Sequence, residues 1–283
     1  MDKKLPVTVI VCTLNEEKYI DRCLTAIENN SPSEIIVVDG GSTDRTVEIA
    51  RKHNAIVFCT KPGLASQRQL GLDNATQFYV MFVDAFHLLA PLILNAQNFC
   101  IETLLYELSA GGYDALQARE FDGLQWNGSY WSRGRASANR AITIHDFPKE
   151  TNMVGRPAVY KTSALRVHGF DSYFDGVGDE DTDLSIRLSA AGCRQGIGTG
   201  VAWRMDDLTF RQLCGKLNKY GRGDARIIKK YPWKKWEIIY HQLVRYPIVR
   251  GLKAVRRGDG KYLPYYVLCG WVRFIATLGE LWR

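Results

Sequence analysis

Several patterns that would assign a chain to a common class are absent from this sequence. Its seven cysteines stand singly, with no CxxC pair and no spacing typical of metal ligands, so we expect buried free thiols in a reducing compartment. Internal repeats and low-complexity tracts are also missing. With 283 residues, 46% of them hydrophobic, the chain can bury a large core. These features predict one globular domain with an appendage.

Long apolar runs are scarce as well. The opening apolar stretch is interrupted at Asn15 and Glu16, which is too soon for a signal peptide. The final one is broken by Arg273 and Glu280 within about 20 residues, so a membrane-spanning helix is not indicated. We therefore expect a cytoplasmic protein, either free or peripheral at the inner face of the membrane.

Negative charge is scarce in one part of the chain. Residues 204–261 contain 16 Lys and Arg against 5 Asp and Glu, although the net charge of the whole chain is only +7. Such a basic block suits an anionic partner, which could be the phosphates of a ligand, nucleic acid or an anionic membrane surface.

What the first third of the sequence does contain is an alternation of apolar runs and helical patterns. The runs are residues 7–12, 34–38, 55–58 and 78–83. Helical spacing recurs in residues 16–28, and Ser42-Thr43-Asp44 is a start signal for another helix. This alternation predicts βαβ units, and hence an α/β fold with a Rossmann-like, mostly parallel sheet flanked by helices.

Farther along, the pattern predicts helices and a strand around a long loop. We expect a helix over residues 91–108, stopped by Gly111-Gly112, a strand over 114–119 and a helix over 184–191. Periodicity fails between residues 121 and 151, where aromatic, basic and glycine residues predict a long binding loop.

Polar residues follow three of the predicted strands. Thr13 and Glu16 come after the first strand, Asp39 after the second and Asp84 after the fourth. Ligands of parallel sheets bind at the carboxyl ends of the strands, so these residues are candidates for a site. Asp39 is the second residue of VDGGSTDRT, which is not the GxGxxG of dinucleotide-binding folds, and a capped turn explains this segment about equally well.

A second group of acids stands before the helix predicted at residues 184–191. Residues 179–183 contain four carboxylates, those of Asp179, Glu180, Asp181 and Asp183. Capping a helix needs one or two acids. A carboxylate at a helix N-terminus also stays ionised, which is the state that a general base needs.

Taken together, these segments resemble the motif series of family-2 glycosyltransferases. The matching stretches, in order, are VIVCTLNEE, VVDGGSTDRT, GLASQRQLGLDNA, FVDAFHLLAP and GFDSYFDGVGDEDTDLSIRL. The resemblance implies the GT-A fold and inverting transfer of a sugar from a nucleotide-sugar donor, with UDP favoured, to an acceptor hydroxyl. It implies a GT-A domain at residues 1–230, and the composition of residues 231–283 predicts a basic, aromatic-rich helical tail after it.

The resemblance also implies roles for single residues at the donor site. Thr13, Glu16 and Asp39 would contact the nucleoside, and Arg68 would help to hold the nucleotide. Asp84 matches the first acid of the Asp-x-Asp motif of the family.

In the acidic segment, the resemblance implies the catalytic pair. Asp181 matches the base of the Glu-Asp motif of the family, in which Glu180 is the first acid. Asp181 would deprotonate the acceptor hydroxyl as it attacks the anomeric carbon.

The sequence departs from the family pattern where a metal is usually bound. Phe86 replaces the acid that normally binds Mg²⁺ or Mn²⁺, and His87, one position later, is a candidate ligand with Asp84. Arg204 stands where many relatives have a metal-binding His, and it can bind phosphate bidentately. Arg222 lies in YGRGDA, which resembles a segment over the donor phosphates in a subgroup of these enzymes.

Three hypotheses therefore stay open. Arg204 and Arg222 neutralise the diphosphate with weak or no metal; Asp84 and His87 hold a divalent cation; or the chain binds nucleotide sugar with no or little turnover. The expected acceptor is a glycan or a lipid-linked molecule. Nucleic acid is not expected as a partner, because the acids at the strand ends and in residues 179–183 would repel its phosphates.

The basic C-terminal end has two interpretations. Residues 236–240 and 262–282 combine aromatic and aliphatic residues with nearby basic ones, which is typical of helices lying at a membrane interface. Amphipathic helices packed on the catalytic domain, or on a second subunit in a homo-oligomer, would give the same pattern.

Overall fold

The computed structural model describes residues 4–89, 100–123, 127–140 and 148–283. The chain forms two compact units. Unit 1 consists of Met1–Glu120, Asp146–Asp175 and Glu180–Met205, and unit 2 of Phe121–His145, Gly176–Asp179 and Asp206–Arg283. The sequence predicted a boundary near residue 230, whereas these units are each assembled from several stretches of the chain.

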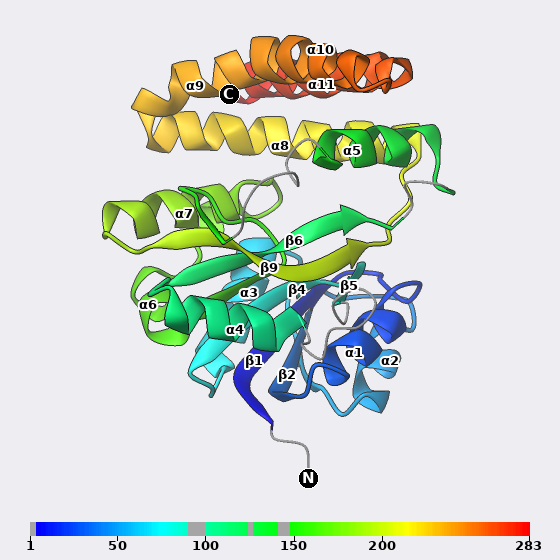
Figure 1. Cartoon of the computed structure of the whole chain (residues 1–283). Helices are drawn as coiled ribbons and strands as arrows, with labels where there is room; N and C mark the ends of the chain where they lie inside the picture. The colour runs from blue at the N-terminus through cyan, green and yellow to red at the C-terminus, as the bar shows by residue number, and fades with distance from the viewer. Residues whose placement is uncertain (1–3, 90–99, 124–126, 141–147) are drawn as a thin grey trace. The chain divides into compact units, whose positions relative to one another are not determined.

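A mixed β-sheet forms the centre of unit 1 (Figure 1). In the described residues it has nine strands in the order β3-β2-β1-β4-β8-β6-β9-β5, with β7 beside β9. The strands are β1 (Leu5–Thr13), β2 (Pro32–Asp39), β3 (Ile56–Cys59), β4 (Tyr79–Asp84), β5 (His87–Leu89), β6 (Ala115–Asp122), β7 (Lys149–Glu150), β8 (Ala158–Lys161) and β9 (Gln195–Arg204). The first four are parallel, as the βαβ pattern predicts.

Beyond β4 the sheet continues with antiparallel pairs, namely β4 with β8, β8 with β6, β9 with β5 and β9 with β7. The prediction of an α/β fold with a parallel central sheet and flanking helices is confirmed. The antiparallel extension is built from strands that come later in the chain, and one of them, β8, pairs directly with β4.

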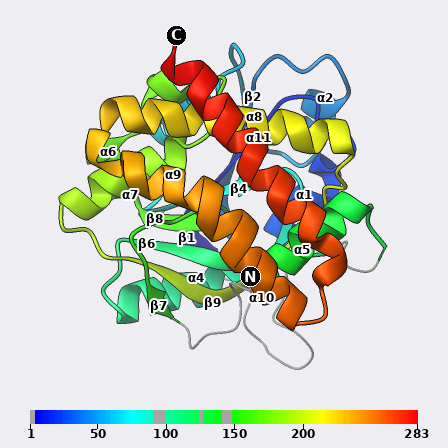
Figure 2. The ribbon, with the colours of Figure 1, turned by 90° about the horizontal axis from the view of Figure 1, so that it is seen from above.

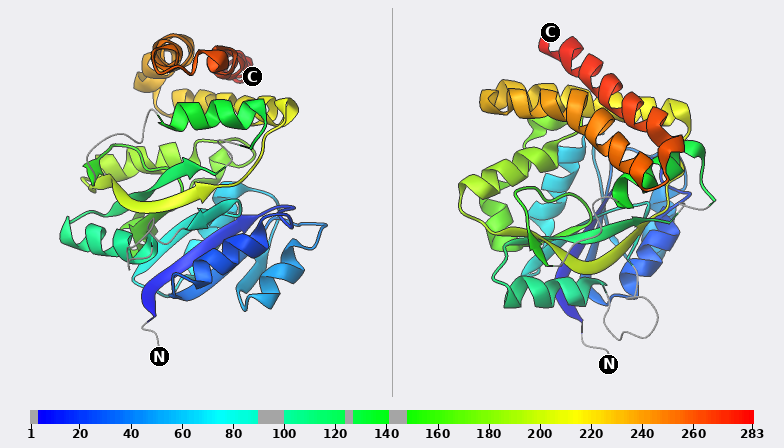
Figure 3. Two further views of the ribbon diagram at one scale, coloured as in Figure 1. Left: turned by 45° about the vertical axis from the view of Figure 1, so that its right-hand side comes forward. Right: turned by 45° about the horizontal axis from the view of Figure 1, so that its top comes forward.

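Helices cover both faces of this sheet (Figure 3). They are α1 (Ile20–Glu28), α2 (Thr46–Lys52), α3 (Leu64–Asn74), α4 (Cys100–Ala110), α6 (Thr162–His168) and α7 (Glu180–Ala190), with a 3₁₀ turn at Ser172–Phe174. Alternate residues of β1 face opposite sides: Val9 belongs to the core beneath α1 and α4, and Ile10 to the core beneath α3 and α7. The continuous apolar runs of the parallel strands follow from burial on both faces.

Unit 2 is helical. Its elements are α5 (Tyr130–Arg140), α8 (Phe210–Lys230), α9 (Lys235–Tyr240), a π-helix (His241–Arg250), α10 (Gly251–Arg256) and α11 (Leu263–Leu281), with 3₁₀ turns at Pro232–Lys234 and Gly260–Tyr262. The segment from α9 to α10 and the helix α11 run side by side (Figure 2). We call these two antiparallel segments, residues 233–282, the C-terminal hairpin. None of the helices described has an apolar run long enough to span a bilayer.

The prediction of a long loop over residues 121–151 is wrong for α5. The buried positions of α5 carry small or polar side chains, among them Ser132, Arg135, Ser137 and Ala138. Few large apolar residues recur at helical spacing in such a helix, so its sequence shows no clear apolar period. The structure also begins α7 at Glu180, four residues before the predicted start. Part of the helix predicted over residues 91–108 lies outside the described residues; its remainder is α4, which ends before Gly111-Gly112 as expected.

Candidate active site

At the ends of β1 and β2, Thr13 and Asp39 stand opposite each other in the strand register. Both are buried. The Asp39 carboxylate accepts hydrogen bonds from the backbone N–H groups of Gly41 (2.9 Å) and Ser42 (2.7 Å) and from the Thr13 hydroxyl (2.9 Å). Asp39 therefore shapes the turn after β2, as a capping residue would, and the predicted contact with a nucleoside stays a prediction.

Glu16 lies beside the same turn. Its backbone N–H donates to the Thr46 hydroxyl at 2.8 Å, which joins the end of β1 to the start of α2. The Glu16 side chain is half-buried. The structure thus brings Thr13, Glu16 and Asp39 together at one edge of the parallel sheet, where the sequence placed them.

Asp84 ends β4, the strand next to β1. Its Oδ1 is 3.3 Å from Nη2 of Arg68, and its Oδ2 is 4.0 Å from Nδ1 of His87. Burial would raise the pKa of Asp84, but Arg68, followed by His87, Arg156 and Arg204, outweighs burial and holds that pKa below its usual range. Asp84 is therefore an ionised carboxylate among cationic side chains.

Arg68, on α3, links Asp84 to the acidic helix. Its Nη1 donates to Oε1 of Glu180, and both side chains are buried. Burial lowers the pKa of Arg68, but Glu180 and Asp84 outweigh it and raise that pKa. Burial raises the pKa of Glu180, Asp181 adds to the rise, and Arg68 and Arg156 oppose it. The Arg68–Glu180 pair thus fixes the start of α7 relative to the end of β4.

Asp181 and Asp183 occupy the first turn of α7 and have different surroundings. Asp181 is half-buried, and its Oδ1 accepts the backbone N–H of Thr182 at 2.8 Å. Asp183 is fully buried and accepts from Nε of Arg187 at 2.9 Å. Arg187 also donates to the backbone carbonyl of Gly169 at 2.9 Å, so Asp183 has a structural role. Asp181 is the acid of this pair that retains access to solvent.

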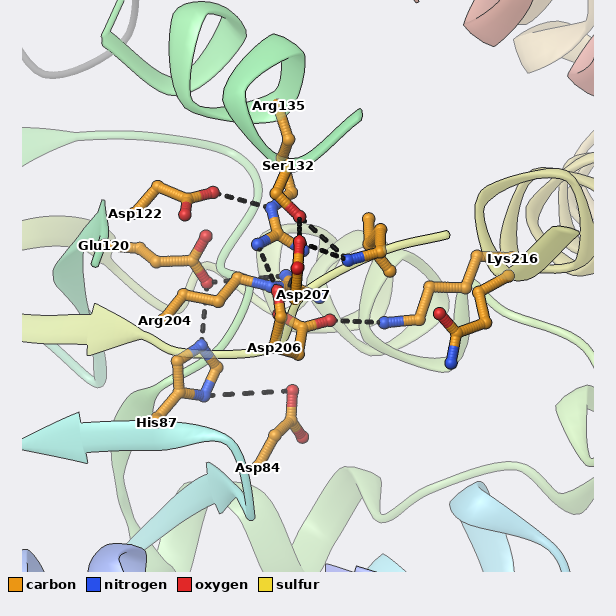
Figure 4. Close-up of polar contacts among 12 residues, drawn as sticks. Asp84, His87, Glu120, Asp122, Ser132, Arg135, Arg204, Asp206, Asp207 and Lys216 are labelled. Carbon is orange, nitrogen blue, oxygen red and sulfur yellow. Dashed lines mark hydrogen bonds and ion pairs between the residues drawn. The ribbon is translucent and has the colours of Figure 1, made fainter. Parts of the chain in front are cut away.

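Phe86, which stands where the family usually has an acid, makes a cation–π contact. The guanidinium of Arg204 lies 4.5 Å from the centroid of the Phe86 ring. Strand β5 pairs with β9 so that His87 stands directly opposite Arg204. Glu120, on β6, contacts both residues. Its Oε2 is 2.8 Å from Nε2 of His87, at hydrogen-bond distance, and 3.7 Å from Nη1 of Arg204, as an ion pair. Figure 4 shows Glu120 between the ring of His87 and the guanidinium of Arg204, and Asp84 facing the other nitrogen of His87.

Sequence reasoning missed Glu120 and Arg156. Glu120 is a single acid within a strand, and its role comes from a partner 33 positions away in the chain. Arg156 is buried, with its guanidinium 5.6 Å from the centroid of Phe82 and its Nη2 3.7 Å from Glu180. A basic residue in a short apolar segment was the only local signal for Arg156, and its burial next to an acid could not be read from spacing.

Arg222, the other predicted phosphate-binding residue, belongs to α8 in unit 2. Its Nε lies 3.1 Å from a carboxylate oxygen of Glu280 on α11, so the structure gives it an ion pair within unit 2. Another ionic group of unit 2 surrounds Arg135, whose guanidinium contacts Asp122 at 2.7 Å and Asp206 at 2.9 Å (Figure 4). Lys216 pairs with Asp206 at 2.7 Å.

A divalent cation has a limited donor set here. The described residues contain no cluster of three or more His, Cys, Asp or Glu arranged to bind a metal. Asp84 and His87 are the candidate ligands, because Oδ2 of Asp84 and Nδ1 of His87 face each other at 4.0 Å. Nδ1 of His87 is buried without a hydrogen-bond partner, while Nε2 is held by Glu120, the arrangement in which a carboxylate orients a metal-binding imidazole. This pair fits a cation whose remaining ligands come from a diphosphate and water.

The fold is that of an α/β protein whose candidate site residues lie at the carboxyl ends of parallel strands β1, β2 and β4 and in the acidic first turn of α7. Residues 8–169 match the family described as Glycosyl transferase family 2, which is more than half of the chain. The chain belongs to this family.

Curated relatives share part of the chain. The lipopolysaccharide core biosynthesis glycosyltransferase LpsC of Rhizobium meliloti is 34% identical over 91 residues, which is 30% of this chain and 33% of LpsC. An uncharacterized glycosyltransferase of Rickettsia typhi is 25% identical over 228 residues, covering 79% of this chain and 68% of that protein. The match to LpsC thus spans a third of its length.

Solved structures show the same fold at low identity. S. aureus TarS, residues 1–349, superposes with a TM-score of 0.53 and 17% identity over 99% of this chain and 93% of that one. Glucosyl-3-phosphoglycerate synthase from Mycobacterium tuberculosis, in complex with Mn²⁺, UDP and glucosyl-3-phosphoglycerate, has a TM-score of 0.53 and 18% identity over 79% of each chain. These likenesses support the GT-A fold that the sequence motifs imply.

Proposed function

We propose that this protein is an inverting glycosyltransferase that moves a sugar from a nucleotide-sugar donor, with UDP favoured, to a hydroxyl of a glycan or lipid-linked acceptor. One observation carries the proposal: the Arg68–Glu180 pair ties Asp84 at the end of β4 to the first turn of α7, where Asp181 is accessible. Membership of the glycosyltransferase family supports this proposal, as do the similar structures of glucosyl-3-phosphoglycerate synthase in complex with UDP and of TarS in complex with UDP-GlcNAc.

In this mechanism Asp181 is the general base. Its carboxylate takes the proton of the acceptor hydroxyl while that oxygen bonds to the anomeric carbon. The bond from this carbon to the diphosphate oxygen breaks with its electron pair, and the nucleoside diphosphate leaves from the opposite face. One displacement inverts the configuration, and a second carboxylate nucleophile is not needed. Glu180, buried against Arg68, acts as a positioning residue for this turn of α7.

The leaving diphosphate gains negative charge, and Arg204 is the side chain proposed to stabilise it. The guanidinium is held from two sides, by the face of Phe86 and by Glu120. A pre-positioned guanidinium can bind phosphate oxygens without reorganising as charge develops. In this interpretation the ring of Phe86 supports the guanidinium of Arg204, which takes over part of the role of a bound metal ion. Arg222 stays a weaker candidate because it already pairs with Glu280.

A second candidate for this step is a divalent cation held by Asp84 and His87. The buried Nδ1 of His87 without a hydrogen-bond partner is the observation that favours it. When bound, such an ion would supply positive charge to the diphosphate. His87 and Asp84 would hold the ion, and Glu120 would keep Nε2 of His87 protonated.

The donor nucleoside is proposed to lie against Thr13, Glu16 and Asp39, with Arg68 helping to hold the nucleotide. Support comes from their common position at the ends of β1 and β2 and from the family pattern. A nucleotide-sugar-binding protein with no or little turnover would use the same residues. It would bind the donor but release no diphosphate when an acceptor is added.

A thermal-shift panel of UDP-, GDP- and dTDP-sugars, each with Mn²⁺ and with EDTA, tests the proposal. We expect a UDP-sugar to raise the unfolding temperature, and an equal rise in EDTA supports Arg204. A rise that EDTA removes supports the Asp84–His87 cation instead. The absence of any shift with all donors would contradict the proposed donor site. Diphosphate release that depends on an acceptor then separates an enzyme from a binding protein.

A further inference from the structure

The outward side of helix α11 is apolar along its whole length. Its exposed large side chains are Leu263, Val267, Trp271, Ile275, Leu278 and Trp282. Because they follow one another at intervals of three or four residues, they form a single stripe on one face of the helix. Their exposed fractions run from 38% to 88%. Within Leu263–Leu281, all of which the structure describes, no exposed position carries a charge.

The neighbouring segment of the C-terminal hairpin has a matching stripe. Its exposed large apolar and aromatic residues are Trp233, Trp236, Tyr240, Ile248, Leu252 and Val255. They too recur at intervals of three, four or eight residues, along the 3₁₀ turn, α9, the π-helix and α10. We call the two stripes together the apolar face of the hairpin.

The inner side of the hairpin packs Tyr265, Tyr266 and Cys269 into an apolar core with α8, and a buried polar network stands beside that core. Asp224 of α8 accepts from Nε and Nη2 of Arg273 on α11, both at 2.9 Å, and from Nε2 of Gln242 at 2.7 Å. Gln242 also donates to Thr277 at 2.8 Å. A helix in water normally turns its polar residues outward and its apolar residues inward. Here α11 buries one apolar side and a polar network against α8, and yet it carries a second apolar stripe on its outward side.

Packing fixes the orientation of this apolar face. A Cβ atom on Gly270 would clash with the carbonyl oxygen of Gln242 and come within 2.9 Å of Pro247, so the two segments touch through their backbones. On the other side of α11, a Cβ on Gly221 of α8 would lie 2.6 Å from the Cβ of Ala276. The hairpin is therefore locked against α8, and rotation of α11 cannot bury its stripe.

Basic side chains accompany the apolar face. The exposed ones in residues 231–261 are Lys235, Arg245, Lys253, Arg256, Arg257 and Lys261. Across residues 231–283, which the structure describes completely, Glu237 is the one exposed acid. Trp233, Trp236, Trp271 and Trp282 are exposed on the hairpin, and Trp prefers the boundary between lipid and water.

We propose that the apolar face of the hairpin docks in the headgroup region of a membrane that contains anionic lipids. The stripes would enter the boundary between headgroups and acyl chains, and the basic residues would contact lipid phosphates. A second copy of this chain is the less suitable occupant, because two such faces would bring together basic residues of the same charge. The proposal does not depend on the sugar-transfer reaction and is tested without it.

The experiment is co-sedimentation of the full chain with vesicles of phosphatidylcholine alone and of phosphatidylcholine mixed with phosphatidylglycerol. We expect sedimentation with the mixed vesicles, and much less in high salt. The double variant Trp271→Ser, Ile275→Ser should lower the partition coefficient by at least about tenfold, because two exposed side chains would no longer enter the lipid boundary. Lys253→Gln with Arg256→Gln should lower it by about fivefold for each charge removed.

Matched controls come from unit 1. Phe78→Ser with Val167→Ser removes two exposed apolar side chains, and Arg51→Gln with Lys61→Gln removes two exposed charges, yet both pairs should leave vesicle binding unchanged. Unchanged unfolding temperatures would show that each variant is folded. The proposal is overturned if the wild-type chain sediments with neither vesicle, or if hairpin and control variants lose binding equally. A dimer that Trp271→Ser, Ile275→Ser converts to monomer, without vesicle binding, would overturn it in favour of a second copy.

Discussion

Around Asp84, basic and acidic side chains alternate, because Glu180 pairs with Arg68 and Glu120 with Arg204. Arg68 contacts Asp84 directly, and His87, Arg156 and Arg204 all add to the lowering of its pKa. Arginine side chains that are already oriented by acids are suited to bind an anionic group such as a diphosphate. At the scale of residues, the replacement of an acid by Phe86 is accompanied by a cation–π contact with Arg204.

The role of Asp181 as base gives a direct prediction. Asp181→Asn should lower turnover by about 10²- to 10⁴-fold, because the amide cannot take the proton of the acceptor hydroxyl. Donor binding, measured by thermal shift, should stay near the wild-type value. Asp183→Asn is the matched control: it disturbs the buried pair with Arg187, so it should lower the unfolding temperature and leave turnover of the folded protein largely intact. Equal loss of donor binding and turnover in Asp181→Asn would remove it from the role of base.

Arg204 is expected to act on the diphosphate. Arg204→Gln should lower kcat by about 100-fold, the usual cost of removing one donor to a developing anion. Arg204→Lys should recover only part of this, since a lysine lacks the planar fork and stacks less well on Phe86. Steady-state kinetics in EDTA measure both effects.

The control for Arg204 is Arg194→Gln, which breaks an ion pair with Glu150 between exposed side chains. Such surface pairs contribute about 1 kcal/mol or less, so kcat should not change. If Arg204→Gln keeps the wild-type kcat and EDTA abolishes activity, the result would contradict this role of Arg204 and favour a divalent cation held by Asp84 and His87.

At the scale of elements, short strands and helix contacts decide where the site residues lie. Strand β5 has three residues, too few to be recognised from an apolar run, yet its pairing with β9 sets His87 opposite Arg204. Helix α5 carries its buried contacts on polar side chains, among them Arg135 between Asp122 and Asp206. Both elements depend on partners distant in sequence, so local spacing could not reveal them.

The hairpin gives a prediction about close helix packing. Gly270→Ala should lower the free energy of unfolding by about 1–3 kcal/mol, because the new methyl group would meet Gln242 and Pro247. On the same helix, Gly279 has no atom within 4 Å of the position of a Cβ, so Gly279→Ala should leave stability equal or raise it by a few tenths to about 1 kcal/mol. Thermal unfolding compares them, and equal shifts for the two variants would contradict the close contact.

At the scale of the whole molecule, the pH dependence of stability has a predictable sign. Burial, followed by the charges of Arg273, Arg250 and Arg245, lowers the pKa of His241 to about 4. Between the ordinary pKa and this value, the unfolded chain binds a proton that the folded chain does not. The contribution of His241 is therefore complete above about pH 6.5 and is lost as the pH falls toward 4, at a cost on the order of 2–3 kcal/mol.

His241→Gln should flatten the fall in unfolding free energy between pH 6.5 and 4. His53 provides a control of opposite sign: burial lowers its pKa, but Asp21 and Glu28 outweigh burial and raise it. Its contribution is present below the ordinary pKa and is lost as the pH rises through the folded-state pKa, so His53→Gln should weaken the chain mainly at low pH. Denaturant unfolding at several pH values measures both. An unchanged slope in His241→Gln would show that other groups dominate.

The sequence by itself determined the parallel half of the sheet, the acids at the strand ends and the family motifs. These depend on local order: apolar runs buried on both faces make parallel strands, and residues that follow a strand are delivered to its carboxyl end. Tertiary structure alone decided which partner each charge has. The pairing of Arg68 with Glu180, the placing of Glu120 between His87 and Arg204, and the outward turn of the apolar face come from contacts between distant segments, which no local pattern encodes.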